Sequence, residues 1–257
     1  MIPETFVGVD LTDYYARSPR PIDVAILDNA SGTVGYKSMD WPPRGNAAML
    51  KLSARLKEFL RGPTVFVIDG PQALAEPQNR TRDVERCLGT PAHTPWEMPE
   101  PGAFPFAGYV SGSVEFFAGL VAQNDPVFIL ADLDGVVPGK ATLFEAYPGA
   151  AWKALCAGAL ESKKKGQGRD QRATLLREMG LHLPLGNPTH DQLDAALCAF
   201  LAWRFFAQDS NCRVMMFGST PVYRDKNGVL REGRMLHPMS PEAKGTAKPL
   251  PVKPAGG

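Results

Sequence analysis

Short apolar runs alternate with turn-forming residues in the first part of the chain. Three such runs predict a meander of adjacent strands at 5–11, 23–27 and 33–39, with the turn-forming "DNASG" between the second and the third. From Asn46 to Leu60, apolar residues recur at helical spacing and "RGP" ends the run, which predicts an amphipathic helix. The apolar run at 64–68 then predicts a fourth strand.

This order of three strands, a helix and a strand is typical of an α/β fold. The helix carries the chain back, so the fourth strand can lie parallel to the first. Both of these strands end in an acid, because Asp10 follows "FVGV" and Asp69 follows "VFVI". We therefore expect Asp10 and Asp69 at the same edge of the sheet. Asp28 also follows an apolar run, but an antiparallel second strand would place it at the opposite edge.

The middle of the chain has a less regular pattern. Residues 71–125 are rich in proline and turn formers and show no clear period, so we interpret them as an irregular insertion after the fourth strand. Within and after this insertion, the pattern predicts further elements, namely helices near 80–88, 113–122, 152–159 and 172–179 and strands at 127–131 and 141–147.

The segment from His190 to Phe206 predicts a buried helix, because it is apolar almost all round. Thr189 before it and Gln192 three residues later have the pattern of a capping box. Further on, "VYRDKNGVLREG" predicts a hairpin that turns at "NG". We expect a single domain at 1–239 and a disordered tail at 240–257, where lysine, proline and glycine dominate.

Composition narrows the class of protein. The 257 residues are 44% hydrophobic, which is ordinary for a folded protein with a core. Lysine and arginine number 28 against 27 acidic residues, so any site for a polyanion must be a local patch. The four cysteines lack CxxC spacing, which argues against a zinc cluster and a disulfide framework.

Localisation follows from two further observations. No apolar run approaches the length of a membrane span, and the first strand begins by Phe6, which leaves no room for a signal peptide ahead of it. Widely spaced cysteines also suit a reducing compartment. We therefore expect a cytoplasmic protein with no membrane partner.

Four carboxylates are candidates for a common site. Asp191 and Asp194 share a helix face, although an acid at Asp191 is also favoured by the helix dipole alone. Asp194 lies beyond the first turn on a helix with little polar surface, and a buried carboxylate needs a compensating partner such as a metal ion. With Asp10 and Asp69 they would offer hard oxygen ligands for Mg2+ or Mn2+. A pair of such ions can promote phosphodiester hydrolysis.

Other candidates carry more than one interpretation. Glu145, in "LFEAYP", could be a ligand, a general base or a strand-end acid. A basic loop and the start of the helix after it could contact phosphates or form solvated surface; its members are Lys163, Lys164, Lys165, Arg169 and Arg172. Arg82 and Arg86 could face the site or pair with neighbouring acids. Aromatic residues of the insertion could stack on bases or pack the insertion; they are Trp96, Phe104, Phe106 and Tyr109.

The motifs together resemble a known family. "GVD", "IDGP", "EAYP", "KKKGQGRDQR" and "HDQLDAALCAF" occur in the same order in an uncharacterised family of predicted ribonuclease-H-like nucleases. The resemblance spans roughly Phe6 to Phe206, and the last motif looks like the closing Asp-x-x-Asp of Holliday-junction resolvases. It implies an α/β fold with a five-stranded mixed sheet in the order 3-2-1-4-5, flanked by helices.

The resemblance also implies roles for particular residues. Asp10 matches the first-strand acid, Asp69 the fourth-strand acid, and Asp191 with Asp194 the closing helix acids, while Glu145 matches the family's own glutamate. The implied activity is that of a nuclease with Mg2+ or Mn2+ as cofactor and nucleic acid as partner. The chain departs from the family in its proline-rich stretch and its C-terminal extension.

Two other functions compete with this one. A binding module could keep the fold without cutting, although retention of the four acids argues against it. The sugar-kinase and actin-like branch needs two domains with glycine-rich phosphate loops, which the chain lacks. The sequence leaves open whether the substrate is RNA, DNA, a hybrid or a junction. Resolvase action would require a dimer, and no interface is predicted.

Overall fold

A computed structural model of the chain describes most of its length. The described residues are 3–45, 47–122, 127–156, 159–162, 165–208 and 212–239. The tail at 240–257, predicted to be disordered, lies outside these residues, as do Lys163 and Lys164 of the basic loop.

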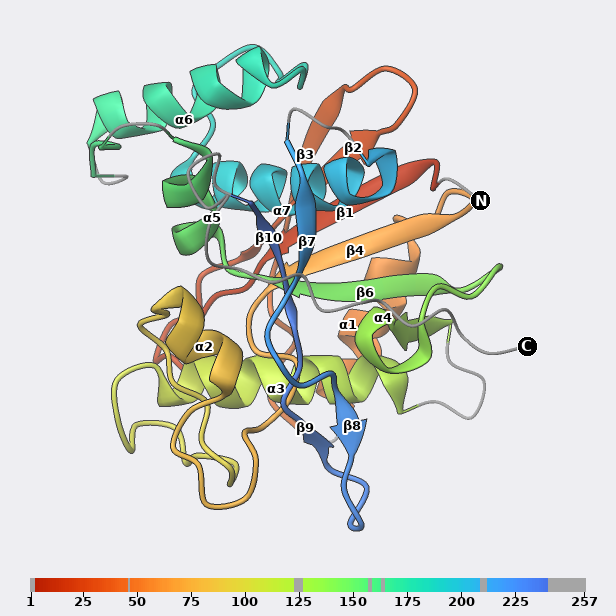
Figure 1. The fold of residues 1–257 in the computed structure, drawn as a ribbon, viewed down its shortest axis with the longest axis vertical. Helices are drawn as coiled ribbons and strands as arrows, with labels where there is room; N and C mark the ends of the chain where they lie inside the picture. The colour runs from red at the N-terminus through yellow and green to blue at the C-terminus, as the bar shows by residue number, and fades with distance from the viewer. Residues whose placement is uncertain are drawn as a thin grey trace.

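An eight-stranded mixed sheet forms the centre of the molecule (Figure 1). Its strands are β1 (Thr5–Asp10), β2 (Ile22–Asp28), β3 (Val34–Met39), β4 (Thr64–Asp69), β5 (Phe128–Leu130), β6 (Ala141–Ala146), β7 (Val214–Phe217) and β10 (Met235–Pro238). The strand order is β3-β2-β1-β4-β6-β10-β7, and β5 pairs with β6 beside this path. The predicted meander is confirmed, because β1, β2 and β3 are successively antiparallel.

The predicted order 3-2-1-4 is confirmed, but the sheet is larger than the five strands that we expected. β6 lies parallel to β4 in the fifth position, and β10 and β7 continue the sheet beyond it. The sequence did not predict β7 and β10 because each has only four residues and no alternating pattern. They form strands because β6 offers an edge on which β10 can pair in parallel.

The register of β1 and β4 places two acids at one edge of the sheet. The two strands are parallel, and Asp10 is the direct partner of Asp69. Asp28 instead pairs with Thr5 at the start of β1, as the antiparallel β2 requires. The prediction that Asp10 and Asp69 share an edge while Asp28 lies at the other is confirmed.

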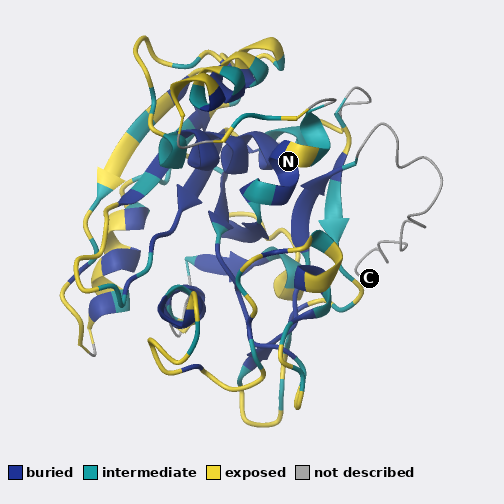
Figure 2. Ribbon diagram, turned by 90° about the vertical axis from the view of Figure 1, so that its left-hand side faces the viewer, coloured by how far each residue is buried: buried dark blue, intermediate teal, exposed yellow. Residues whose placement is uncertain are grey.

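Helices cover both faces of the sheet. They are α1 (Ala48–Lys57), α2 (Asp83–Leu88), α3 (Ala107–Val121), α4 (Ala131–Asp134), α5 (Pro148–Leu155), α6 (Gly166–Glu178) and α7 (His190–Ala207). The apolar side chains of α7 pack with Phe6 and Val67 on one face, and those of α1 and α3 pack with Val7 and Phe66 on the other. The central strands β1, β4 and β6 are almost entirely buried, whereas the edge strand β3 has three exposed residues, and other exposed residues lie in the peripheral loops and helices (Figure 2).

The predicted insertion contributes to the core as well as to the surface. α3 begins at Ala107, earlier than expected, and its Phe116 and Phe117 are buried against the sheet. The short α2 and the turns around it form the irregular part. Residues 71–125 are therefore partly a covering layer of the sheet, which the proline-rich composition did not reveal.

Two local predictions are confirmed near the C-terminal part. The Thr189 hydroxyl accepts a hydrogen bond from the Gln192 amide at 3.1 Å, and the Gln192 side chain accepts one from the Thr189 amide at 2.9 Å, which forms the capping box of α7. The hairpin of β8 (Tyr223–Arg224) and β9 (Leu230–Arg231) turns through Gly228, whose φ of 78° suits glycine. No helix in the described part of the chain is long and apolar enough to span a membrane.

Candidate functional site

A cavity of about 980 Å3 opens where β1, β4 and β6 end, at the carboxyl edge of the sheet. Open α/β sheets bind ligands at this edge. All five acids singled out from the sequence line the cavity, namely Asp10, Asp69, Glu145, Asp191 and Asp194. The structure therefore brings together side chains from two strand ends, a third strand and one helix.

Strand parity directs Asp10 and Asp69 to the same face. Side chains alternate along a strand, so Asp10 lies on the same face as Gly8, and Asp69 lies on the same face as Val67. Val67 packs toward α7, so this is the face that α7 covers. Asp10 is only 5% exposed. Burial of this kind is costly for a charged carboxylate unless other groups compensate it.

Gly8 allows α7 to approach these acids. A Cβ atom on Gly8 would lie 2.6 Å from the backbone nitrogen of Ala199 and closer still to the carbonyl oxygen of Ala195. No other residue type fits this contact, so the helix backbone rests directly on β1. The contact places Asp194, one residue before Ala195, beside the ends of the strands.

Asp194 is held by a tryptophan from α5. It is 3% exposed, and the Trp152 indole Nε1 donates a 2.6 Å hydrogen bond to its Oδ1. The Arg172 guanidinium lies 5.6 Å from the centroid of the Trp152 ring and donates to the Gly168 carbonyl at 2.7 Å. Arg172 of α6 therefore belongs to the cavity lining, where it contacts the Trp152 ring.

Asp69 is held by a tyrosine from α3. The Tyr109 hydroxyl donates to Asp69 Oδ1 at 3.1 Å. Burial, together with the nearby Asp69 and Asp10, raises the pKa of Tyr109 well above its usual range. Burial and the charges of Asp69, Asp10 and Asp194 likewise raise the pKa of the Cys198 thiol. In both groups burial is the largest cause, and the charges of the nearby acids add to it.

Asp191 has different surroundings. Its side chain is paired with Arg20, and the His190 Nε2 lies 2.9 Å from its Oδ1. It lines the cavity at the start of α7. The ion pair with Arg20 and the position at the helix N-terminus account for an acid at residue 191 without any ligand. Both interpretations of Asp191, as a site acid and as a helix-terminus acid, therefore remain.

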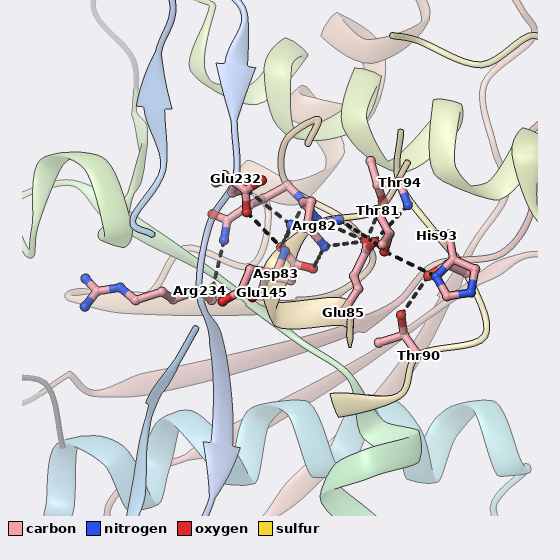
Figure 3. A network of polar contacts seen from close by, with 12 residues as sticks. Thr81, Arg82, Asp83, Glu85, Thr90, His93, Thr94, Glu145, Glu232 and Arg234 are labelled. Atoms are coloured by element: carbon pink, nitrogen blue, oxygen red, sulfur yellow. Dashed lines mark hydrogen bonds and ion pairs between the residues drawn. The ribbon is translucent and has the colours of Figure 1, made fainter. Parts of the chain in front are cut away.

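Glu145 points to the other side of the sheet from Asp69. In the register of β4 and β6, Asp69 pairs with Ala146 and Glu145 pairs with Ile68. Glu145 accepts hydrogen bonds from Arg82 at 2.8 and 2.5 Å, as Figure 3 shows, and burial raises its pKa. This carboxylate is engaged by an internal arginine.

Arg82 is the centre of a buried network at the start of α2 (Figure 3). It is fully buried and also donates through Nε to Glu85 at 3.0 Å. Glu85 in turn accepts from the Thr94 hydroxyl at 2.5 Å. Burial opposes the charge of Arg82, but Glu145 and Glu85 outweigh it and raise the pKa of the guanidinium. The sequence left open whether Arg82 faces the site or pairs with neighbouring acids. In the structure it pairs with Glu85 and Glu145, and it also belongs to the cavity lining.

The remaining predicted basic residues are spread out. Arg86 is exposed and pairs with Asp83 at 3.3 Å, which is the surface pairing left open from the sequence. Lys165 is exposed beside Glu161, 3.5 Å away, and Arg169 is not on the cavity lining. Lys163 and Lys164 lie outside the described residues.

Several cavity residues were not anticipated as a group. Arg20 and Lys153 contribute positive charge to the lining, and Trp152 contributes an aromatic ring. Phe106, which the sequence offered as a residue that could stack on bases or pack the insertion, contributes a second ring. Arg20 lies in a loop without a motif, and Lys153 is an isolated lysine of α5. Arg20 and Lys153 reach the cavity only because the fold places their segments there, so their spacing along the chain gave no indication of a common site.

The donor chemistry of the cavity suits a hard divalent cation. Carboxylate oxygens favour Mg2+ or Mn2+, and Asp10, Asp69 and Asp194 supply them from three elements. Among the residues that the structure describes, no three His, Cys, Asp or Glu side chains are gathered closely enough to form a metal cluster. The carboxylates thus fit such an ion in kind, without forming a closed set of ligands.

One comparison with known proteins gives a match, and the matched segment contains three of the five acids on the cavity lining. The model of a family described as "Protein of unknown function (DUF429)" matches residues 129–216, which is less than half of the chain. The matched segment contains Glu145, Asp191 and Asp194, and it excludes Asp10 and Asp69. No curated protein and no solved structure matches the chain.

Proposed function

We propose that this chain is a metal-dependent nuclease with a ribonuclease-H-like fold, acting on phosphodiester bonds. The observation that carries the proposal is the register of two parallel strands, which pairs Asp10 with Asp69 at the edge of a cavity that Asp194 of α7 also lines. The order β3-β2-β1-β4 agrees with the order that the motif resemblance implies. The cavity at this edge supplies room for a substrate.

Asp10, Asp69 and Asp194 would hold Mg2+ or Mn2+, with Asp191 as a further acid at the start of α7. Such ions stabilise the attacking and leaving oxygens of a phosphodiester. Acidic side chains outnumber basic ones among the described residues of the lining. Because that excess repels a phosphate, a bound cation is the simplest way for this cavity to accept one.

The chain's own side chains orient the carboxylates. Trp152 fixes one oxygen of Asp194, and Tyr109 fixes one oxygen of Asp69. The Tyr109 phenol is protonated at neutral pH, so its hydroxyl is available to donate to Asp69. Arg82 neutralises Glu145, which makes that glutamate a support for the cavity floor and removes it from the set of ligands.

The test compares cation binding and cleavage in matched variants. Mn2+ and Mg2+ are titrated by calorimetry into the wild type, Asp10→Asn, Asp194→Asn and the control Asp170→Asn, an exposed acid of α6 away from the cavity. Loss of outer-shell partners alone costs about 10- to 100-fold in affinity, so loss of a ligand should cost at least about 100-fold. The cation should also raise the melting temperature of the wild type and of Asp170→Asn.

Cleavage is measured in parallel on labelled single-stranded, duplex, hybrid and junction substrates. We expect cation-dependent cutting by the wild type and by Asp170→Asn, and none by Asp10→Asn. Nucleic acid binding by a wild type that binds no cation and cuts nothing would favour the alternative, a non-catalytic binding module. The absence of a closed metal cluster among the described residues is the observation that favours this alternative.

A further inference from the structure

The acids of the cavity lie at its floor. Asp10 and Asp194 are 5% and 3% exposed, although both line a cavity of about 980 Å3. The insertion forms one wall through residues such as Pro91 and Phe106, and α5 and α6 contribute another through Lys153 and Arg172. A substrate must therefore enter between two walls before its phosphate can approach the carboxylates.

This depth discriminates between nucleic acid structures. In a double helix, paired and stacked bases hold both backbones on a wide, stiff rod, and enzymes with enclosed sites must first unpair the nucleotide that they act on. A single strand can bend and present one phosphate at a time. The cavity volume lies at the upper end of the roughly 300–1,000 Å3 of enclosed ligand sites, which suits a short flexible segment.

Phe106 gives the cavity an aromatic surface. Its side chain is 50% exposed, and it lines the cavity directly before the start of α3. Its backbone has a φ of 70°, in the left-handed region that a bulky residue rarely adopts. Such strain is retained where the surrounding structure imposes it, often at functional sites. Three residues later, Tyr109 contacts Asp69, so the ring is tied to the acids through the first turn of α3.

Lys153 supplies positive charge on another part of the lining. It is exposed and follows Trp152, whose indole holds Asp194. Proteins that bind single strands combine aromatic rings on which bases stack with basic groups that follow the backbone. The lining of this cavity contains both kinds of group around the acids.

We propose that the substrate of this cavity is single-stranded nucleic acid, with Phe106 stacking on a base and Lys153 contacting a phosphate. The inference rests on the proposed function and adds the substrate class. Phe106 and Lys153 are positioning residues in this account, since neither touches the reacting atoms.

The test measures binding separately from cleavage. Short labelled single strands of DNA and RNA, and blunt duplexes of the same sequences, are titrated with protein by fluorescence anisotropy, in chelator and in Mg2+. We expect the single strands to bind at least about 10-fold more tightly than the duplexes. Phe106→Gly should weaken single-strand binding about 5- to 150-fold, the range of one lost base-stacking contact.

Two comparisons exclude a structural explanation. Glycine tolerates a φ of 70°, so Phe106→Gly should melt at or above the temperature of the wild type, whereas loss of a structural residue would lower it. Trp96→Ala, which removes an exposed aromatic of the same insertion away from the cavity, should bind single strands as the wild type does.

The outcomes separate this inference from the proposed function. Equal binding of duplex and single strand, or wild-type affinity in Phe106→Gly, would overturn the inference even if cation-dependent cleavage is observed. Preferential, Phe106-dependent binding of single strands without any cleavage would support the inference as a binding mode and reject the nuclease.

Discussion

His237, on β10, is a buried histidine outside the cavity lining. It is 9% exposed, and its ring centroid lies 5.4 Å from that of Phe217. Its Nδ1 has no hydrogen-bond partner among the described residues. Burial lowers the pKa of His237 to about 4. The ring is therefore neutral in the folded protein at pH values where an unfolded histidine is already protonated.

This shift predicts acid sensitivity of the fold. Below pH 6.5 the unfolded chain binds a proton that the folded chain does not. The contribution of His237 to the free energy of unfolding is therefore complete above about pH 6.5 and is lost as the pH falls toward 4. The loss approaches about 3 kcal/mol. Urea unfolding at pH 7 and pH 4.5 should show a smaller loss in His237→Phe than in the wild type. The same pH dependence in both proteins would show that His237 is not responsible.

At the scale of residues, the sequence predicted the acids better than their partners. Asp10 and Asp69 were identifiable because each follows an apolar run, and strand parity then fixes their direction. The partners of Glu145 were not identifiable, because Arg82 reaches it only through the fold of the insertion. Phe106 was one of four aromatic candidates, and nothing in the local pattern singled out its exposed position.

At the scale of elements, the contact between α7 and β1 determines the site. Gly8 brings the two backbones together, and Asp194 comes to the strand ends through this contact. The capping box at Thr189 fixes where the helix begins, and therefore which helical positions face β1. The capping box was predicted from the sequence, whereas the close contact at Gly8 was found only in the structure.

Gly8→Ala should disturb this contact. A methyl group would clash with the backbone of α7, and overpacking of this kind costs about 1–3 kcal/mol or more. We expect lower stability in urea and weaker cation binding, because Asp194 would move away from Asp10. Gly35→Ala is the matched control, since its Cβ meets nothing within 4 Å on β3, and its stability should stay within about 0.5 kcal/mol of the wild type. Equal effects of the two substitutions would contradict the close contact.

Long periodic elements were predictable, and short ones were not. α7 and the first four strands have lengths and patterns that determine them locally. β7 and β10 have four residues each and depend on pairing with distant strands. The start of α3 at Ala107 was missed because glycines and prolines precede and interrupt its apolar residues.

At the scale of the whole molecule, charge is balanced, with a formal net charge of +1. Under the proposed function, a polyanion would be attracted only through local groups. Of the basic side chains on the cavity lining, Lys153 and Arg20 are exposed, whereas Arg172 is buried. This arrangement differs from proteins whose broad basic surfaces dominate nucleic acid binding. Under the proposed function, affinity for a nucleic acid in this cavity would depend largely on stacking and on the cation.

A weak salt dependence of single-strand binding is expected from this arrangement. Each neutralised phosphate of a single strand contributes about −0.7 to the slope of log K against log salt, so two or three contacts give a slope of about −1 to −2. Anisotropy titrations over a series of KCl concentrations measure this slope, and Lys153→Gln should reduce its magnitude by about 0.7. A slope steeper than about −5 would indicate a much larger basic surface than the cavity provides.

The contact of α7 with β1 also sets the order in which the site can assemble during synthesis. Ribosomes deliver Asp10 and Asp69 early and Asp194 only after most of the chain has been made. Until α7 emerges, the face of β1 at Gly8 lacks the helix that covers it. A truncated product released before that point would carry Asp10 and Asp69 without Asp194, so its strand ends would lack the carboxylate that α7 supplies.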